Sequence, residues 1–267
     1  MWTKHSRVDP KFLPGRMEQT MPLQAIIFDL GGTLIDWPDW DEDVNRRWAL
    51  SYDYLTTHVP STRWPDREAY VYAMREAERT HWQQVTESQA SSTPISLLRQ
   101  GFRFLGYEVG EEDLLVAMDG YARAVNGWAI IFPDTVQTLL ALRKRGYPLG
   151  LLSNTWWAAE WHNADLAAHG LTALLDEVVY TSDLPHSKPH PATFLEVTKR
   201  LSVDPKQCVM IGDRMIDDVS GAQGVGMRGV WKKNNYPWPK PEYIVPSGVI
   251  STLSELLPLL EEWEQEG

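Results

Sequence analysis

From about residue 130 onward, the chain alternates short apolar runs with amphipathic helical patterns. An earlier apolar run, LQAIIFDL at 23–30, lacks polar alternation, as expected of a parallel strand that is covered on both faces. Strands that alternate with helices form parallel sheets through right-handed crossovers. We therefore predict an α/β fold with a doubly wound, Rossmann-like parallel sheet. After the first, its strands are expected at 147–153, 177–182, 207–213 and 228–231.

The stretch between the first strand and this alternation has a different pattern, because helical periodicity dominates it. REAYVYAMREAERTHW and PISLLRQGFRFLG are its clearest helices, and Thr93 before Pro94 predicts a helix N-cap. We interpret 37–130 as an all-helical cap domain, inserted into a core domain formed by 22–36 and 131–267. Residues 1–21 carry charges and prolines without an apolar stretch, so we expect an N-terminal extension that is not a signal peptide.

Charge and composition exclude several classes of partner. The net charge of −11 argues against a nucleic-acid-binding protein, which needs a positive footprint for phosphate contacts. No apolar run reaches the roughly 18–20 residues of a membrane span. The single cysteine, Cys208, is compatible with a reducing compartment. We therefore expect a cytoplasmic protein without nucleic-acid or membrane partners, and the sequence leaves its oligomeric state open.

Polar residues stand at the carboxyl ends of the predicted strands, where ligands of open parallel sheets bind. These ends carry Asp29, Ser153, Asp183 and Asp213, and Lys188 follows on the loop after the third. An aspartate at a strand end is often only a turn former, so each residue alone is a weak signal. Carboxylates, a hydroxyl and a lysine that converge at one edge are suited to a phosphate group and a metal ion.

Four segments make the case stronger. FDLGGTL, LLSNT, SKPHP and IGDRMIDD, in this order, resemble the four motifs of the haloacid dehalogenase (HAD) superfamily. The resemblance covers about residues 22–265 and includes a helical cap inserted after the first motif. It implies a hydrolase, most readily a Mg²⁺-dependent phosphatase that acts on a small phosphate monoester.

The resemblance also implies roles for the acids of the first and fourth motifs. Asp29 would be the nucleophile that attacks phosphorus and forms an aspartyl-phosphate. Asp213 would join Asp29 and the main-chain carbonyl of Gly31 in holding Mg²⁺ through oxygen ligands. Ser153 and the amides of residues 30–32 would bind phosphoryl oxygens.

The remaining motif residues receive supporting roles by the same resemblance. Lys188 would offset the negative charge of the nucleophile and the phosphate, and Asp218, which aligns better than Asp217, would orient Lys188 or a metal-bound water. The alternative explanation for Asp217 and Asp218 is that negative charges stabilise the N-terminus of a helix. The predicted substrate-binding residues are Gly32, Thr33, Asn154 and Trp156.

One position departs from the family pattern. Phosphatases of the family usually carry a second aspartate two residues after the nucleophile, which protonates the leaving oxygen, and here that position is Gly31. General acid–base catalysis typically contributes about 10²–10⁴ in rate. A glycine carbonyl can still bind a metal ion, so the substitution removes the proton donor and keeps the metal ligand.

Several reactions could accommodate this glycine. A phosphonatase would need a cap lysine for a Schiff base, and no lysine occurs between Lys11 and Lys144. A 2-haloacid dehalogenase also lacks the second aspartate, but such enzymes tend to lose the acid that stands here as Asp213. A phosphatase could act on a good leaving group, or use another acid, for which Asp36 and two histidines, His186 and His190, are candidates. A phosphate-binding pseudo-enzyme without turnover is the remaining alternative.

Tryptophans are concentrated near the predicted site. Trp37 and Trp40 stand where the chain enters the cap, and Trp156 and Trp157 follow the second motif. They could form an aromatic wall that stacks on a substrate, or they could pack the cap against the core. The sequence leaves both interpretations open.

Overall fold

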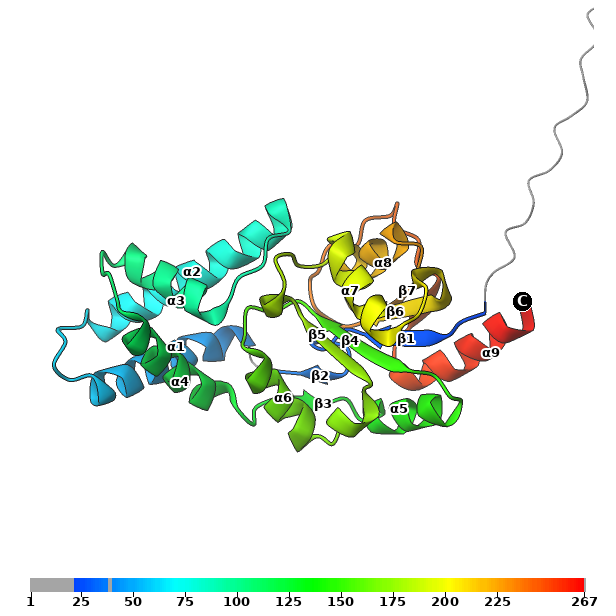
Figure 1. The fold of residues 1–267 in the computed structure, drawn as a ribbon, viewed down its shortest axis with the longest axis horizontal. Coiled ribbons are helices and arrows are strands. Elements are labelled where there is room, and N and C mark those ends of the chain that lie inside the picture. The colour runs from blue at the N-terminus through cyan, green and yellow to red at the C-terminus, as the bar shows by residue number, and fades with distance from the viewer. Residues whose placement is uncertain (1–21, 38–39, 267) are drawn as a thin grey trace, which may run out of the picture.

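The computed structural model describes residues 22–37 and 40–266 (Figure 1), so the predicted extension at 1–21 lies outside the described residues. A six-stranded parallel sheet has the order β5-β4-β1-β6-β7-β8. This sheet confirms the predicted α/β class. Its strands are β1 (Ala25–Phe28), β4 (Leu149–Ser153), β5 (Glu177–Tyr180), β6 (Cys208–Gly212), β7 (Arg228–Lys232) and β8 (Gly248–Ile250).

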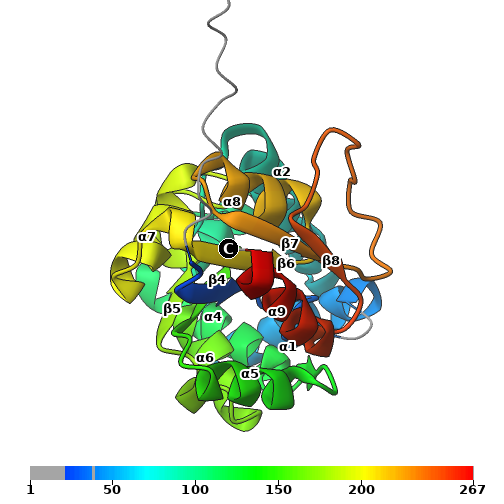
Figure 2. The same ribbon diagram turned by 90° about the vertical axis from the view of Figure 1, so that its right-hand side faces the viewer.

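Helices cover both faces of this sheet (Figure 2). On β1, Ile26 and Phe28 point into a cluster with the helices α5, α6 and α9, whereas Ala25 and Ile27 point into a cluster with α7 and α8. Burying one such large apolar side chain contributes roughly 1.5–3 kcal/mol, so both layers stabilise the central strand. The helices are α5 (Thr135–Lys144), α6 (Ala159–Ala168), α7 (Pro191–Leu201), α8 (Gly221–Gly224) and α9 (Leu256–Glu266).

Four helices form a separate layer beside the core (Figure 1). They lie between two short antiparallel strands, β2 (Ile35–Asp36) and β3 (Ile130–Ile131), so the chain leaves and re-enters the core at paired positions. The limits 36/37 and 130/131 of the cap domain stay a prediction. The helices are α1 (Trp40–His58), α2 (Arg67–Ser88), α3 (Pro94–Phe104) and α4 (Glu111–Val125).

Local signals explain where the cap helices begin and how they pack. The Thr93 hydroxyl accepts a hydrogen bond from Ser96 N at 3.2 Å, and Ser96 Oγ accepts one from Thr93 N at 2.9 Å, which confirms the predicted N-cap of α3. The four helices share a buried aromatic cluster that includes Trp48, Tyr70 and Tyr121. Trp156, Trp157 and Trp161 from the core domain belong to the same cluster, so it also joins the cap to the core.

The cap also contacts the core directly through main-chain pairing. Ala90, just after α2, forms an antiparallel bridge with His186. Ser187 N donates to the main-chain oxygen of Gln89 at 2.9 Å, and Ser91 N donates to that of Pro185 at 3.2 Å. The loop that contains Lys188 is therefore attached to the end of a cap helix.

Two helices differ from the sequence expectation. The pattern WWAAEWHNADLAAHG predicts a helix from Trp156 onward, but α6 begins at Ala159, after a turn in which the Thr155 hydroxyl accepts a hydrogen bond from Trp157 N. The pattern VSGAQGVGM predicts a helix at 219–227, where the structure has a turn of π-helix at 215–220 followed by the short α8. Such π-turns are frequent at functional sites. None of the helices in the described part of the chain is long and apolar enough to cross a membrane.

Candidate active site

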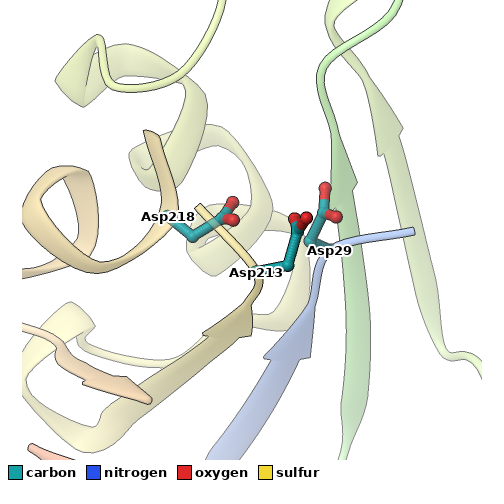
Figure 3. Close-up of side chains that lie close together, drawn as sticks. All are labelled: Asp29, Asp213 and Asp218. Atoms are coloured by element: carbon teal, nitrogen blue, oxygen red, sulfur yellow. The ribbon is translucent and has the colours of Figure 1, made fainter. Parts of the chain in front are cut away.

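The first, second and fourth motifs meet because their strands are neighbours in the sheet. β1 pairs with β4 on one side and with β6 on the other, so Asp29, Ser153 and Asp213 stand at adjacent strand ends. Asp218 comes from the π-turn after β6, and its carboxylate also faces the strand ends (Figure 3). One carboxylate oxygen from each of Asp29, Asp213 and Asp218 lies within 4.8 Å of the others, and all three residues are buried.

The third motif contributes a buried lysine to this group. Lys188, 1% exposed, donates from Nζ to Asp29 Oδ1 at 2.7 Å, to Asp218 Oδ1 at 2.6 Å and to the Leu152 carbonyl at 2.9 Å. An ammonium group has three donors, so all of them are used. Burial lowers the pKa of Lys188, but Asp218 and Asp29 outweigh it and raise the pKa above its ordinary value. The lysine therefore stays charged beside Asp29.

The structure distinguishes between the two neighbouring acids of the fourth motif. Asp218 binds Lys188 through Oδ1 and accepts a hydrogen bond from Arg214 N through Oδ2 at 2.9 Å. Asp217 instead pairs with the Arg214 guanidinium at 3.2 Å. Asp218 is thus the acid that contacts Lys188, as the comparison with the family motif favours, while its role in catalysis stays a prediction. Arg214 was not among the predicted site residues, although it directly follows Asp213.

The carboxylates carry more negative charge than their surroundings compensate. Burial raises the pKa of Asp29 to about 6, against the lowering effect of Lys188. Burial, Asp29 and Asp218 together raise the pKa of Asp213 to about 7. Asp213 Oδ1 is buried and has no hydrogen-bond partner among residues 22–37 and 40–266. A cluster of carboxylate oxygens with one unpartnered oxygen fits a hard divalent cation such as Mg²⁺.

Two of the predicted substrate-binding residues have mainly structural contacts. Asn154 accepts a hydrogen bond from Lys188 N at 2.7 Å and donates to the Lys188 carbonyl at 2.9 Å, so it holds the third motif in place. Gly32 has φ +74°, and its amide donates to the Ile35 carbonyl at 2.9 Å. The Gly32 amide is therefore occupied within the chain in this conformation, and phosphate binding by the amides of residues 30–32 stays a prediction.

The other two predicted substrate-binding residues, Thr33 and Trp156, are both buried but have different surroundings. The Thr33 hydroxyl is fully buried and lacks a hydrogen-bond partner in the described part of the chain, so it can donate to a ligand. Trp156 is 1% exposed, stacks on Trp48 with ring centroids 5.9 Å apart, and lies 5.2 Å from Tyr121. These contacts pack the cap against the core, and a role of Trp156 in substrate binding stays a prediction.

Trp37 covers the position of the missing aspartate. A Cβ atom added to Gly31 would lie 2.9 Å from Cζ3 of Trp37. The Trp37 ring makes edge contacts with Trp157, at 5.5 Å between centroids, and with His162, at 5.8 Å. The side chain of Trp40, also expected near the site, lies outside the described residues. The space that a side chain at residue 31 would use is thus taken by an aromatic ring.

The three candidate substitute acids have other contacts. Asp36 accepts hydrogen bonds from the Tyr236 hydroxyl at 2.8 Å and from Trp37 N at 2.9 Å. His186 and His190 stack on each other, with ring centroids 3.7 Å apart. Asp36 thus serves as an acceptor in this structure, and the two histidines contact each other.

A segment that the sequence analysis did not single out also reaches the site. In the loop 233–247, between β7 and β8, Asn234 and Trp238 donate hydrogen bonds to Asp213 Oδ2 at 2.5 and 2.9 Å. The only sequence signal was a run of polar and aromatic residues, NNYPW, directly after a strand whose carboxyl end lies at the same edge of the sheet.

Comparison with known proteins identifies the family. A family model described as haloacid dehalogenase-like hydrolase matches residues 23–226. The chain belongs to this family of hydrolases. The motifs and the inserted helices agree with that assignment.

Named relatives include both phosphatases and a dehalogenase. Glyceraldehyde 3-phosphate phosphatase of Methanopyrus kandleri is 31% identical over 49% of this chain, which spans 57% of that relative. Phosphoglycolate phosphatase of Escherichia coli K12 is 28% identical over 91% of this chain and 95% of its own length. The chain also resembles the crystal structure of 2-haloacid dehalogenase from Pseudomonas syringae pv. Tomato, with a TM-score of 0.64 and a sequence identity of 26%. The match covers 90% of this chain and 99% of the dehalogenase.

Proposed function

We propose that this hydrolase is a Mg²⁺-dependent phosphatase that acts on a small phosphate monoester through an aspartyl-phosphate at Asp29. The buried cluster of Asp29, Asp213 and Asp218 carries the proposal. Three carboxylates would repel a phosphate group, so a divalent cation between them would favour phosphate binding. A dehalogenase that attacks carbon without a metal has no use for Asp213. The two phosphatase relatives support the same choice.

Under this proposal, residues of this chain take part in each step. Lys188 binds Oδ1 of Asp29 and fixes the carboxylate, which leaves Oδ2 to attack phosphorus. The P–O bond to the leaving group breaks as the aspartyl-phosphate forms, and water then attacks phosphorus and releases phosphate. Ser153 and Thr33 donate hydrogen bonds to phosphoryl oxygens. Asp29, Asp213 and the Gly31 carbonyl would hold Mg²⁺, which would supply positive charge for the phosphoryl group.

Gly31 and Trp37 limit the leaving group. No carboxyl group stands at residue 31 to protonate the leaving oxygen, and Trp37 occupies the space in which it would stand. A leaving group that departs as a stable anion needs little protonation. We therefore expect better turnover for phosphate esters of acidic hydroxyl groups than for those of simple alcohols.

The test is a screen of sugar, nucleotide and carboxylate phosphates together with 2-haloacids, with and without Mg²⁺. The proposal predicts phosphate release that requires Mg²⁺ and is abolished in Asp29→Asn, and acid-quenched single turnovers that contain phosphorylated protein. Halide release without phosphate release would support the dehalogenase alternative. Equal phosphate release by the wild type and Asp29→Asn would instead support the pseudo-enzyme.

A further inference from the structure

The loop 233–247 and the strand before it place three N–H donors around Asp213, and their distribution is uneven. Trp238 Nε1 and Asn234 Nδ2 both donate to Oδ2, at 2.9 and 2.5 Å. Trp231 Nε1, from β7, donates to the main-chain oxygen of Asp213 at 3.0 Å. Within residues 22–37 and 40–266, Oδ1 has no partner although it is buried. The donors thus hold one carboxylate oxygen and leave the other open.

The two donors on Oδ2 are held in place by contacts of their own. Asn234 Oδ1 accepts a hydrogen bond from Tyr236 N at 3.1 Å, which turns the amide nitrogen toward Asp213. The ring of Trp238 lies 4.0 Å from the guanidinium carbon of Arg214, a cation–π distance. The Tyr236 hydroxyl donates to Asp36, which links the loop to the segment after the first motif. The loop is therefore attached on both sides of Asp213.

Gly32 provides the room for this arrangement. A Cβ atom at this residue would lie 2.7 Å from Asp213 Oδ2 and 3.0 Å from Asn234 Nδ2. Any side chain at this position would therefore push against the carboxylate and one of its donors. The close approach of Gly32, Asp213 and Asn234 joins the first motif, the fourth motif and the loop.

We propose that Asn234 and Trp238 are positioning residues that orient Asp213 for metal binding, an inference that rests on the proposed function. Two hydrogen bonds on Oδ2 fix the carboxylate plane, so Oδ1 is presented to the cation. Hydrogen bonds to a metal-ligating carboxylate typically change metal affinity by about 10–100-fold when they are removed. The loop thereby tunes the cation affinity of the site without touching the cation.

The test measures the Kd of Mg²⁺ for the full chain by isothermal titration calorimetry. Trp238→Phe removes one N–H donor and keeps the ring on Arg214, and Trp231→Phe is the matched control because its N–H reaches only the main chain of Asp213. We expect the Kd to rise about tenfold in Trp238→Phe and to change less than about twofold in Trp231→Phe. Adding Asn234→Ala to Trp238→Phe should extend the rise toward about 100-fold.

A second measurement separates positioning from folding. In EDTA, Trp238→Phe and Trp231→Phe should melt within about 2 °C of each other, because each loses one hydrogen bond of about 1 kcal/mol. An unchanged Kd in Trp238→Phe, or equal weakening in both variants, overturns the inference. If these results occur while the wild type shows Mg²⁺-dependent phosphate release, the proposed function stands and only the positioning role fails. If the wild type binds no Mg²⁺, the proposed function fails, and this inference fails with it.

Discussion

Replacing Gly31 by a larger residue tests whether Trp37 holds the space of the missing acid. An added Cβ would lie 2.9 Å from Cζ3 of Trp37, well inside the contact distance of about 3.5–4 Å between carbon atoms. The ring cannot retreat freely, because Trp157 and His162 contact it. Gly31→Ala should therefore strain this cluster, and Gly31→Asp should strain it more because it also adds a carboxyl group beside Asp29.

The expected size of the effect follows from two opposing contributions. Overpacking typically costs about 1–3 kcal/mol. Replacing glycine restricts the unfolded chain, which returns about 0.4–1 kcal/mol. We expect Gly31→Ala to lower the free energy of unfolding by about 1–2 kcal/mol, which corresponds to about 2–8 °C in Tm for a chain of this size.

A double-mutant cycle isolates the contact. The free energy of unfolding is measured in urea for the wild type, Gly31→Ala, Trp37→Ala and the double variant. The cost of Gly31→Ala should disappear, or become a small gain, when Trp37 is truncated. A cost that is the same in both backgrounds, within about 0.5 kcal/mol, would refute the steric argument.

The same cycle with aspartate tests the catalytic consequence. Gly31→Asp with Trp37→Ala supplies a proton donor and the space for it, while Gly31→Ala with Trp37→Ala supplies the space alone. On an alkyl phosphate, the first should exceed the second in kcat by about 10²-fold or more, and on an aryl phosphate the two should be similar. Equal rates on the alkyl phosphate would show that the missing acid does not limit turnover.

Two further substitutions test buried charges. Asp218→Asn removes one of the two buried carboxylate partners of Lys188 and should cost about 1.5–3 kcal/mol in urea unfolding, whereas Asp217→Asn, which is more exposed, should cost about 1 kcal/mol or less. Equal costs would contradict the different contacts of the two acids. Burial raises the pKa of Glu78 from 4.5 to about 7, so the folded state holds this proton more tightly and stability falls as pH rises between these values. Glu78→Gln should abolish this fall and raise the free energy of unfolding by about 3 kcal/mol at pH 8. The exposed control Glu87→Gln should leave the pH dependence of stability unchanged. Matching pH–stability curves for the wild type and Glu78→Gln would contradict the raised pKa of Glu78.

The sheet was predictable because its signals are local or follow from a general rule. Apolar runs mark strands wherever both faces are covered, and an N-cap such as Thr93 marks a helix start within four residues. Adjacent strand ends then bring Asp29, Ser153 and Asp213 together without further information. The strand β8 escaped prediction because its three residues, Gly248–Ile250, make no distinct apolar run.

The remaining features depend on contacts between residues far apart in the chain. The π-turn carries Asp218, whose carboxylate binds Arg214 N four residues away and Lys188 30 positions away, and no local pattern encodes the second pairing. Asn154 turned out to hold the Lys188 loop, a partner 34 positions away. Trp238 reaches Asp213 across 25 positions. Residue types at these positions were visible in the sequence, but their partners were set by packing.

Gly31 and Trp37 together change the electrostatics of the site as well as its shape. An aspartate at residue 31 would add a fourth carboxylate to a cluster in which the pKa of Asp29 is already about 6 and that of Asp213 about 7. Each added like charge raises these values further and disfavours the ionised nucleophile. An aromatic ring in the same space adds no charge, so the pKa of Asp29 is spared this further rise. The arrangement thus favours an ionised nucleophile at the expense of proton donation, and this combination suits a substrate whose leaving group needs no proton.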